Sequence, residues 1–312
     1  MRHQPTEYRP GTARGAAPPL GREYDLEGRR LWLHRSGSGG PSMVFLPGAG
    51  LVGLDFLNIH DRAAELTTSV LYDRAGTGWS ERVTLPRTPT EVTDELRGLL
   101  RAADVPGPYL LVGHSLGAFY GRRYAQRFPE DVAGLLLLDP GHEDILSYVP
   151  KQAAELNEQM KPDPEQLPEL SDEQIRSARD QLAQIYAQWP EPVREALIGY
   201  NLASWRTSLR ETENFETEVY DELRHGGDLP DVPLIVLTAG GDNPYWAQFM
   251  PEHLMREAHE GVRAMQAAIA ASVPQGEQRV LTGASHQYGH VEQPDAVFHA
   301  IRDLLGKADA RR

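Results

Sequence analysis

A glycine–serine–glycine turn between a short apolar run and a helix constrains the fold of this chain more than any other feature. The turn reads Gly113-His114-Ser115-Leu116-Gly117, with an expected buried strand over 109–112 and an expected helix over 118–128 that stops at Pro129. Such a turn is too tight for side chains on both sides of the serine, and its strained backbone exposes the hydroxyl. Amides at the start of the helix point to the same place, which suits an oxyanion. We interpret Ser115 as a nucleophile, the alternative being an ordinary turn.

The other apolar runs are short, continuous and widely spaced along the chain. Continuous runs suit strands that are buried on both faces. Segments with apolar residues at helical spacing separate most of them. Strands that alternate with helices predict an α/β fold, with a mostly parallel central sheet flanked by helices. The expected strands are 43–46, 69–72, 109–112, 135–138, 234–237 and 279–281, and the clearest helices are 55–66, 89–103 and 294–305.

Three further segments complete the expected organisation. Residues 1–21 are rich in Pro, Gly, Ala and Arg, and we expect them to be a disordered leader. Residues 24–34 alternate around Glu27-Gly28, as in a hairpin. Residues 142–227 show helical patches and no convincing strand, so we expect a helical cap inserted into a core of 22–141 and 228–312. The alternative is a purely structural elaboration.

Composition narrows the class of protein. A net charge of −14 repels a phosphate backbone and an anionic membrane surface, so nucleic acid is a poor partner. No apolar stretch approaches the roughly 20 residues that a membrane span needs, and no signal peptide is evident, so we expect a cytoplasmic protein without membrane insertion. The chain contains no cysteine, which excludes disulfides and thiolate chemistry. The oligomeric state is not predicted.

A serine hydroxyl needs a neighbouring base to become nucleophilic. We favour His286, which follows the last expected strand in a Gly- and Ser-rich loop before the final helix; His290 is the rival. We expect His114 to pack locally. His253, His259 and His299 fall on expected helices and are interpreted as surface or packing residues.

A carboxylate must orient the base, and two candidates lie just beyond expected strands. Asp242 follows the strand 234–237 in a glycine-containing loop, and Asp139 directly follows the strand 135–138. Either could hydrogen-bond the imidazole and stabilise its protonated form. We favour Asp242; Asp139 could instead hold the start of the cap through Pro140-Gly141.

An oxyanion hole requires two backbone amides. Leu116, directly after the serine, offers one, and the loop Pro47-Gly48-Ala49-Gly50 offers the second through Ala49, with Gly50 as a lesser candidate. No metal site is expected, because a helix face explains Asp55, His60 and Asp61 better. Gly76-x-Gly78 lacks the third glycine of a dinucleotide fingerprint, so we expect no cofactor.

The chain resembles the α/β-hydrolase superfamily from about residue 22 to 307. Four segments carry the resemblance in order: 46–50, 72–80, 113–117 and Ser285-His286. The resemblance implies the chain order nucleophile, acid, histidine, and a cap after the sixth strand. Relatives often have His-Gly where this chain has Pro47-Gly48, which leaves the backbone donor in place. The resemblance also marks Asp73 and Arg74 as scaffold rather than catalytic residues.

Together these features predict a cofactor-free serine hydrolase acting on an ester, lactone or thioester of a mostly apolar small molecule. In this hypothesis Ser115 attacks, His286 transfers the proton, Asp242 or Asp139 orients the histidine, and the Ala49 and Leu116 amides bind the oxyanion. Because fold does not fix function, the alternative is a lyase, a cofactor-free oxygenase or a small-molecule binder on the same scaffold. Four cap aromatics are candidates for the pocket wall, although core packing also explains them: Tyr186, Trp189, Tyr200 and Trp205.

Overall fold

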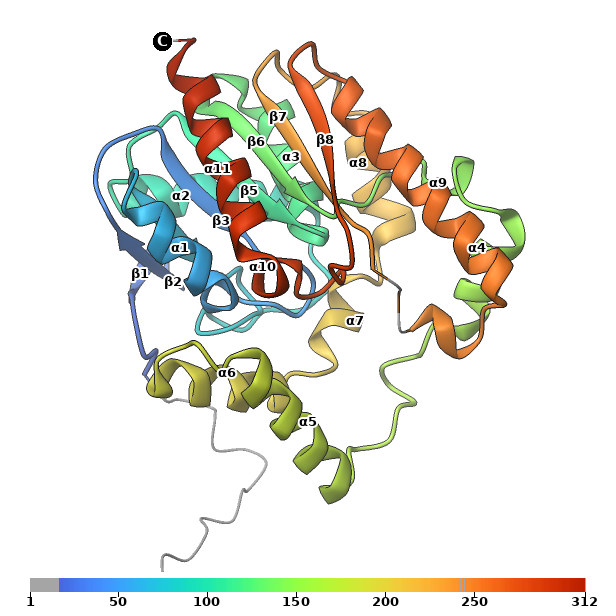
Figure 1. Ribbon diagram of the computed structural model, residues 1–312. Coiled ribbons are helices and arrows are strands. Elements are labelled where there is room, and N and C mark those ends of the chain that lie inside the picture. Colours follow the sequence, from blue (N-terminus) through green and yellow to red (C-terminus); the bar gives the residue numbers. More distant parts are fainter. Residues whose placement is uncertain (1–16, 242, 244, 312) are drawn as a thin grey trace, which may run out of the picture.

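A single eight-stranded sheet organises the molecule (Figure 1). The computed structural model describes residues 17–241, 243 and 245–311, so most of the expected leader and Asp242 lie outside the described residues. The strand order is β1-β2-β4-β3-β5-β6-β7-β8. The strands are β1 Arg22–Leu26, β2 Arg29–Ser36, β3 Ser42–Leu46, β4 Ser69–Tyr72, β5 Tyr109–His114, β6 Val132–Leu138, β7 Leu234–Ala239 and β8 Gly276–Leu281.

The strand pairing confirms the predicted mostly parallel sheet. From β4 across to β8 all neighbours are parallel, whereas β2 is antiparallel to both β1 and β4. The β1–β2 hairpin turns at Glu27 and Gly28, which have positive φ angles of 55° and 87°. Every residue of β3, β4 and β5 is buried, as the continuous apolar runs predict. Six parallel strands therefore present their carboxyl ends at one edge.

Helices cover both faces of this sheet (Figure 1). Apolar residues of α1 and α11 pack with side chains of β3, β5 and β6 on one face. Apolar residues of α2 and α3, with the carboxyl-terminal end of α9, pack on the other. The bounds are α1 Leu57–Ala64, α2 Pro89–Ala102, α3 Leu116–Arg127, α9 Glu252–Ala271, α10 Gly289–Glu292 and α11 Pro294–Asp309.

The segment between β6 and β7, residues 139–233, contains helices and no strand, and we call it the β6–β7 insertion. In Figure 1, α5 and α6 lie below the edge of the sheet near α10, with α7 above them. Trp189 fixes the end of α5 to the core, because its Nε1 donates to the Leu54 carbonyl at 2.9 Å. The helices are α4 Lys151–Met160, α5 Asp172–Ile185, α6 Glu191–Ala203, α7 Thr207–Glu211 and α8 Tyr220–Arg224.

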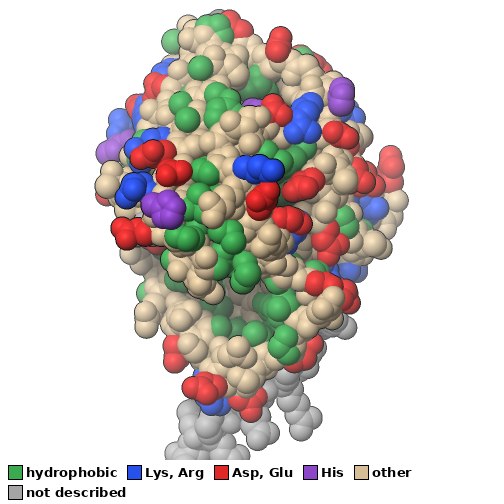
Figure 2. All heavy atoms as spheres, turned by 90° about the vertical axis from the view of Figure 1, so that its right-hand side faces the viewer, with side chains coloured by type: hydrophobic (Ala, Val, Ile, Leu, Met, Phe, Trp, Pro, Cys, Tyr) green, Lys and Arg blue, Asp and Glu red, His purple; other side chains and the backbone are tan. Residues whose placement is uncertain are grey.

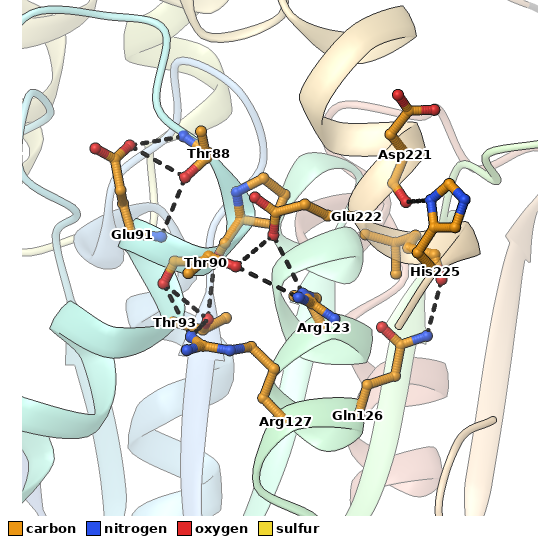
Figure 3. Close-up of polar contacts among 12 residues, drawn as sticks. Thr88, Thr90, Glu91, Thr93, Arg123, Gln126, Arg127, Asp221, Glu222 and His225 are labelled. Carbon is orange, nitrogen blue, oxygen red and sulfur yellow. Dashed lines mark hydrogen bonds and ion pairs between the residues drawn. The ribbon is translucent and has the colours of Figure 1, made fainter. Parts of the chain in front are cut away.

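The last helix of the insertion is fastened to α2 and α3 by polar side chains (Figure 3). Glu222 of α8 accepts hydrogen bonds from Thr90 Oγ1 at 2.6 Å and from Arg123 Nε at 3.2 Å. Gln126 of α3 donates through Nε2 to the Leu223 carbonyl at 3.1 Å. The carboxyl-terminal end of the insertion is therefore held on one face of the sheet, and α5–α6 are held below the edge of the sheet.

The helix expected around His253 and His259 is α9, which runs for 20 residues between β7 and β8. Its amino-terminal half extends beyond the sheet (Figure 1), and Leu254 and Ala258 of this half form an apolar cluster with Ala153 of α4 and with Met250, which precedes α9. Figure 2 shows hydrophobic side chains around a hollow on the side of the molecule where α4 and α9 lie. The two helices thus form one wall beside the carboxyl edge of the sheet.

Candidate active site

Ser115 lies at the turn between β5 and α3, with φ 49° and ψ −116°. A positive φ is strained for any residue with a side chain, and it holds the hydroxyl clear of the turn. Both flanking glycines are required by close packing. A Cβ on Gly117 would lie 1.9 Å from the Leu46 carbonyl oxygen, and one on Gly113 would lie 2.7 Å from Ala118 Cα. The sequence therefore builds the sharp turn that the motif predicts.

Ser115 belongs to a chain of hydrogen bonds that runs across three strand ends. Its Oγ lies 3.0 Å from Nε2 of His286, which follows β8. On the other side of the ring, His286 Nδ1 lies 2.5 Å from Oδ2 of Asp139, which directly follows β6. These distances allow a proton to pass between the hydroxyl and the imidazole while the carboxylate fixes the ring.

Of the two candidate acids, the described residues include only Asp139. Asp139, the alternative candidate, makes the hydrogen bond to His286, and Asp242 lies outside the described residues. Both aspartates follow strands that are neighbours in the sheet, so strand position alone could not separate them. The main chain at Asp139 has a positive φ of 44°, a conformation that is strained for a residue with a side chain.

The second carboxylate oxygen of Asp139 is also fully engaged. Its Oδ1 accepts from the Ala239 amide at 2.9 Å and from Gln266 Nε2 of α9 at 2.8 Å. Burial alone would raise the pKa of Asp139, but the hydrogen bonds from His286, Gln266 and Ala239 lower it below the usual value. Asp139 is therefore held both ionised and oriented. No sequence pattern identified Gln266, since it contacts Asp139 from 127 positions away.

The two other histidines near the serine have structural partners. His114 is buried, and its Nε2 donates to the backbone carbonyl of His286 at 2.7 Å, so it holds the loop that carries His286. His290, the rival base, is buried against Phe56 and its Nε2 donates to the Asp55 carbonyl at 3.1 Å. Burial lowers the pKa of His114 to about 3 and that of His290 to about 4, so both rings are neutral.

The loop after β3 passes directly over the serine. A Cβ on Gly48 would lie 2.5 Å from His114 Nδ1 and 3.3 Å from Ser115 Cβ, so only glycine fits there. Among the described residues, neither the Ala49 amide nor the Leu116 amide donates a hydrogen bond. The Gly50 amide, the lesser candidate, donates to Glu211 Oε2 at 2.7 Å. Of the three candidate amides, only that of Gly50 therefore has a hydrogen-bond partner among the described residues.

Arg74 supports this loop, and Asp73 holds the segments that follow β3 and β4. Asp73 accepts from the amides of Gly53 and Trp79, each at 2.8 Å. Arg74 donates to the carbonyls of Pro47 at 2.6 Å and Gly48 at 3.0 Å. Both side chains are buried, which agrees with the scaffold role that the resemblance implies.

A cavity of about 870 Å³ opens beside Ser115, between the sheet edge, α7, α4 and α9. Its wall combines apolar residues, among them Phe119, Phe215 and Trp246, with charged ones such as Arg256 and Glu260. The four cap aromatics proposed for the pocket are not among its lining residues. Tyr186, Trp189 and Tyr200 are instead buried in the core, where their large apolar rings join the insertion to the sheet.

Among the described residues, no group of three or more His, Asp or Glu side chains is placed to hold a metal ion. The cluster considered in the sequence has local partners. Asp55 accepts from the Val52 amide at 2.7 Å and from the Tyr186 hydroxyl, and His60 Nδ1 pairs with Ser69 Oγ at 2.8 Å. Within the described part of the chain, no helix has the length and apolar character needed to cross a bilayer.

The fold and this arrangement define an α/β-hydrolase. The sequence agrees, since it matches the family described as "Alpha/beta hydrolase family" over residues 43–300, and the chain belongs to that family.

Individual relatives are similar over only part of their length. Uncharacterized protein YqjL of Bacillus subtilis is 37% identical over 115 residues, which is 37% of this chain and 46% of YqjL. A (Lyso)-N-acylphosphatidylethanolamine lipase of Mus musculus is 37% identical over 95 residues, 29% of this chain and 27% of the lipase. The chain therefore spans less than half the length of these curated relatives.

The fold is shared over nearly the whole chain with solved structures. A thermophilic esterase from Thermogutta terrifontis superimposes with a TM-score of 0.57 at 19% identity, covering 93% of this chain and 99% of the esterase. At this identity the similarity concerns the fold alone.

Proposed function

We propose that this chain is a cofactor-free serine hydrolase that cleaves an ester, lactone or thioester of a mostly apolar small molecule through an acyl-enzyme on Ser115. The observation that carries the proposal is the hydrogen-bonded series Ser115 Oγ, His286 and Asp139, with distances of 3.0 and 2.5 Å. The amides of Ala49 and Leu116 donate no hydrogen bond within the described part of the chain, which supports the proposal because acyl transfer needs donors for the developing oxyanion.

Acylation follows from this geometry. His286 Nε2 takes the proton from Ser115 Oγ as the oxygen attacks the carbonyl carbon of the substrate. The amides of Ala49 and Leu116 stabilise the negative charge on the carbonyl oxygen. Asp139 keeps Nδ1 of His286 protonated, so Nε2 is the nitrogen that accepts the proton. The tetrahedral intermediate then expels the alcohol or thiol, which receives the proton from His286 Nε2.

Deacylation uses the same groups in the same order. His286 Nε2 removes a proton from a water molecule as its oxygen attacks the acyl-enzyme carbonyl. The oxyanion is again held by the amides of Ala49 and Leu116. Collapse of this second intermediate releases the carboxylic acid and returns the proton to Ser115.

The apolar residues in the wall of the 870 Å³ cavity support a substrate with an apolar body. The names of two similar proteins, an esterase and a lipase, support a carboxylic ester as the first class to test. We also propose the division suggested by the sequence: a leader over 1–21, a core of 22–141 and 228–312, and a cap over 142–227. The position of α5–α7 below the sheet edge supports the cap (Figure 1).

Labelling with a fluorophosphonate tests the nucleophile without knowledge of the substrate. We expect the wild-type chain to be labelled at Ser115, located by peptide mass spectrometry, and the Ser115→Ala variant to resist labelling. Labelling of another serine at the wild-type rate in the variant would contradict the proposal.

A panel of p-nitrophenyl esters with acyl chains of increasing length tests the reaction. We expect the Ser115→Ala variant to lose kcat by at least about 10³-fold, because the covalent route is removed while binding survives. The lyase, oxygenase or binder would be favoured instead by either of two results. One is undiminished turnover in the Ser115→Ala variant, and the other is a wild-type chain that hydrolyses no ester and resists labelling.

A further inference from the structure

Glu211 is the last residue of α7, in the β6–β7 insertion, yet its side chain ends against the loop after β3. Only 4% of this side chain is exposed. It lies 161 positions along the chain from Gly50, whose amide donates to its Oε2 at 2.7 Å. The insertion therefore supplies a charged group to the loop that carries the proposed oxyanion donor.

The same carboxylate holds the arginine that supports this loop. Arg74 donates from Nε and Nη2 to Oε1 of Glu211 at 3.0 and 2.9 Å. Its Nη1 and Nη2 donate to the carbonyls of Pro47 and Gly48 at 2.6 and 3.0 Å. A two-point contact between guanidinium and carboxylate fixes the plane of the arginine. Glu211 therefore fixes the loop twice, directly at Gly50 and through Arg74 at Pro47 and Gly48.

The geometry of the peptide unit connects these bonds to the Ala49 amide. The Gly48 carbonyl and the Ala49 N–H belong to one planar trans peptide, so they point in opposite directions. Holding the Gly48 oxygen on Arg74 therefore sets the direction of the Ala49 N–H. Gly50 on the next unit is held by Glu211 and lies close to α7, since a Cβ there would lie 2.8 Å from Ser208 Cβ.

We propose that Glu211 is a positioning residue that aims the Ala49 amide at the oxyanion, so that the insertion helps to assemble the oxyanion hole. This inference rests on the proposed serine hydrolase function. Glu211 touches no reacting atom in this scheme, and its effect passes through the backbone of residues 47–50. Its loss should therefore weaken transition-state binding more than ground-state binding.

The Glu211→Gln variant tests this role, because it keeps the shape of the side chain and removes its charge. Whichever way the amide is placed, its NH₂ group faces either Arg74 or the Gly50 N–H, so one contact becomes donor against donor. On the best p-nitrophenyl ester we expect kcat to fall about 10- to 100-fold and KM to change less than about 3-fold. This fall in kcat is smaller than the roughly 10²- to 10³-fold that complete loss of one oxyanion donor costs, because the Ala49 amide is misaligned rather than removed. The affinity of a trifluoromethyl ketone should fall in parallel with kcat/KM.

A second buried ion pair provides a matched control. Arg122 of α3 binds Glu143 at 2.8 and 2.7 Å, and the two side chains are 6% and 8% exposed. No hydrogen bond or ion pair joins Glu143 to residues 47–50 in the described structure, where its side chain pairs with Arg122 and His142. We expect Glu143→Gln to lower the urea midpoint by an amount similar to Glu211→Gln, while kcat stays within about 3-fold of wild type.

Glu222 controls for loosening of the insertion as such. It fastens α8 to Thr90 and Arg123, far along the chain from the loop after β3 (Figure 3). We expect Glu222→Gln to leave both kcat and inhibitor affinity unchanged. A fall in kcat with Glu222→Gln equal to that with Glu211→Gln would overturn the specific role of Glu211.

The other possible results distinguish failure of this inference from failure of the proposed function. If Glu211→Gln keeps kcat within about 3-fold, or changes KM alone, the inference is wrong even though Ser115 is labelled. If Ser115→Ala retains full turnover, the proposed function fails instead. If Glu211→Gln does not fold, Glu211→Asp tests the inference instead. This variant keeps the negative charge that pairs with Arg74, but its side chain is shorter by one methylene group. We expect its kcat to fall about 5-fold or more at unchanged KM. Unaltered kcat in that variant would also refute the inference.

Discussion

At the scale of single residues, the candidate site depends on which carboxylate holds His286. Asp139 lies 2.5 Å from His286 Nδ1 and is held by Ala239 and Gln266. An Asn at position 139 would present an NH₂ group to Nδ1 and favour the wrong tautomer of the ring. We expect Asp139→Asn to lower kcat on the best p-nitrophenyl ester by about 10³- to 10⁴-fold, with folding checked by circular dichroism.

Asp242→Asn is the matched variant for this prediction. It changes the carboxylate favoured from the sequence and should leave kcat within about 3-fold of wild type. The reverse pattern, with activity lost in Asp242→Asn and kept in Asp139→Asn, would assign the acid to Asp242.

The sequence offered local signals for Ser115 and His286, and it left two candidates open for the acid. The glycines around Ser115 and the loop after the last strand are encoded within a few positions, so a pattern can predict them. Asp139 and Asp242 follow neighbouring strands, so strand position does not distinguish them. The features that hold Asp139, its positive φ and its contact with Gln266 of α9, are not visible in the sequence. Glu211 carries no local signal, because it is one of many acidic residues in its segment and its partners are far along the chain.

At the scale of elements, the helices and strands were predicted where periodicity and end signals agree. Helix α2 begins with Thr88 followed by Pro89, and Glu91 completes a capping box. The Thr88 hydroxyl accepts from the Glu91 amide at 3.2 Å, and Glu91 Oε2 accepts from the Thr88 amide at 2.9 Å (Figure 3). The insertion was predicted as helical from its helical patches and its lack of a convincing strand. Its place against the sheet was not predicted, because contacts such as Trp189 with Leu54 join distant segments.

The capping box of α2 gives a prediction at this scale. We expect Thr88→Ala to lower the free energy of unfolding by about 1 kcal/mol, because the Glu91 amide loses its acceptor. Thr88→Ser keeps the hydroxyl and should stay within a few tenths of a kcal/mol of wild type. Urea unfolding followed by circular dichroism measures both, and ester turnover should be the same in the two variants. Equal stability of the Ala and Ser variants would mean that the cap contributes nothing.

At the scale of the whole molecule, Asp55 joins three distant parts of the chain. It lies beside α1 with no exposed surface, accepts from the Tyr186 hydroxyl of the insertion, and its backbone carbonyl accepts from His290 near α11. Burial raises the pKa of Asp55 to about 6, although hydrogen bonds from Tyr186 and the Val52 amide oppose the shift. The folded chain therefore binds a proton here more tightly than the unfolded chain does.

This difference sets the sign of a pH dependence in stability. Because the folded pKa is raised above the unfolded value of 3.8, the contribution of Asp55 is fully present below about pH 4 and is lost as the pH rises through about 6. An Asp55→Asn variant lacks this titration. We expect the stability of wild type relative to Asp55→Asn to fall by about 3 kcal/mol between pH 4 and pH 7, since each pKa unit corresponds to about 1.4 kcal/mol. Urea unfolding of both proteins at several pH values measures the difference, and parallel curves would show that Asp55 titrates alike in the folded and unfolded chains.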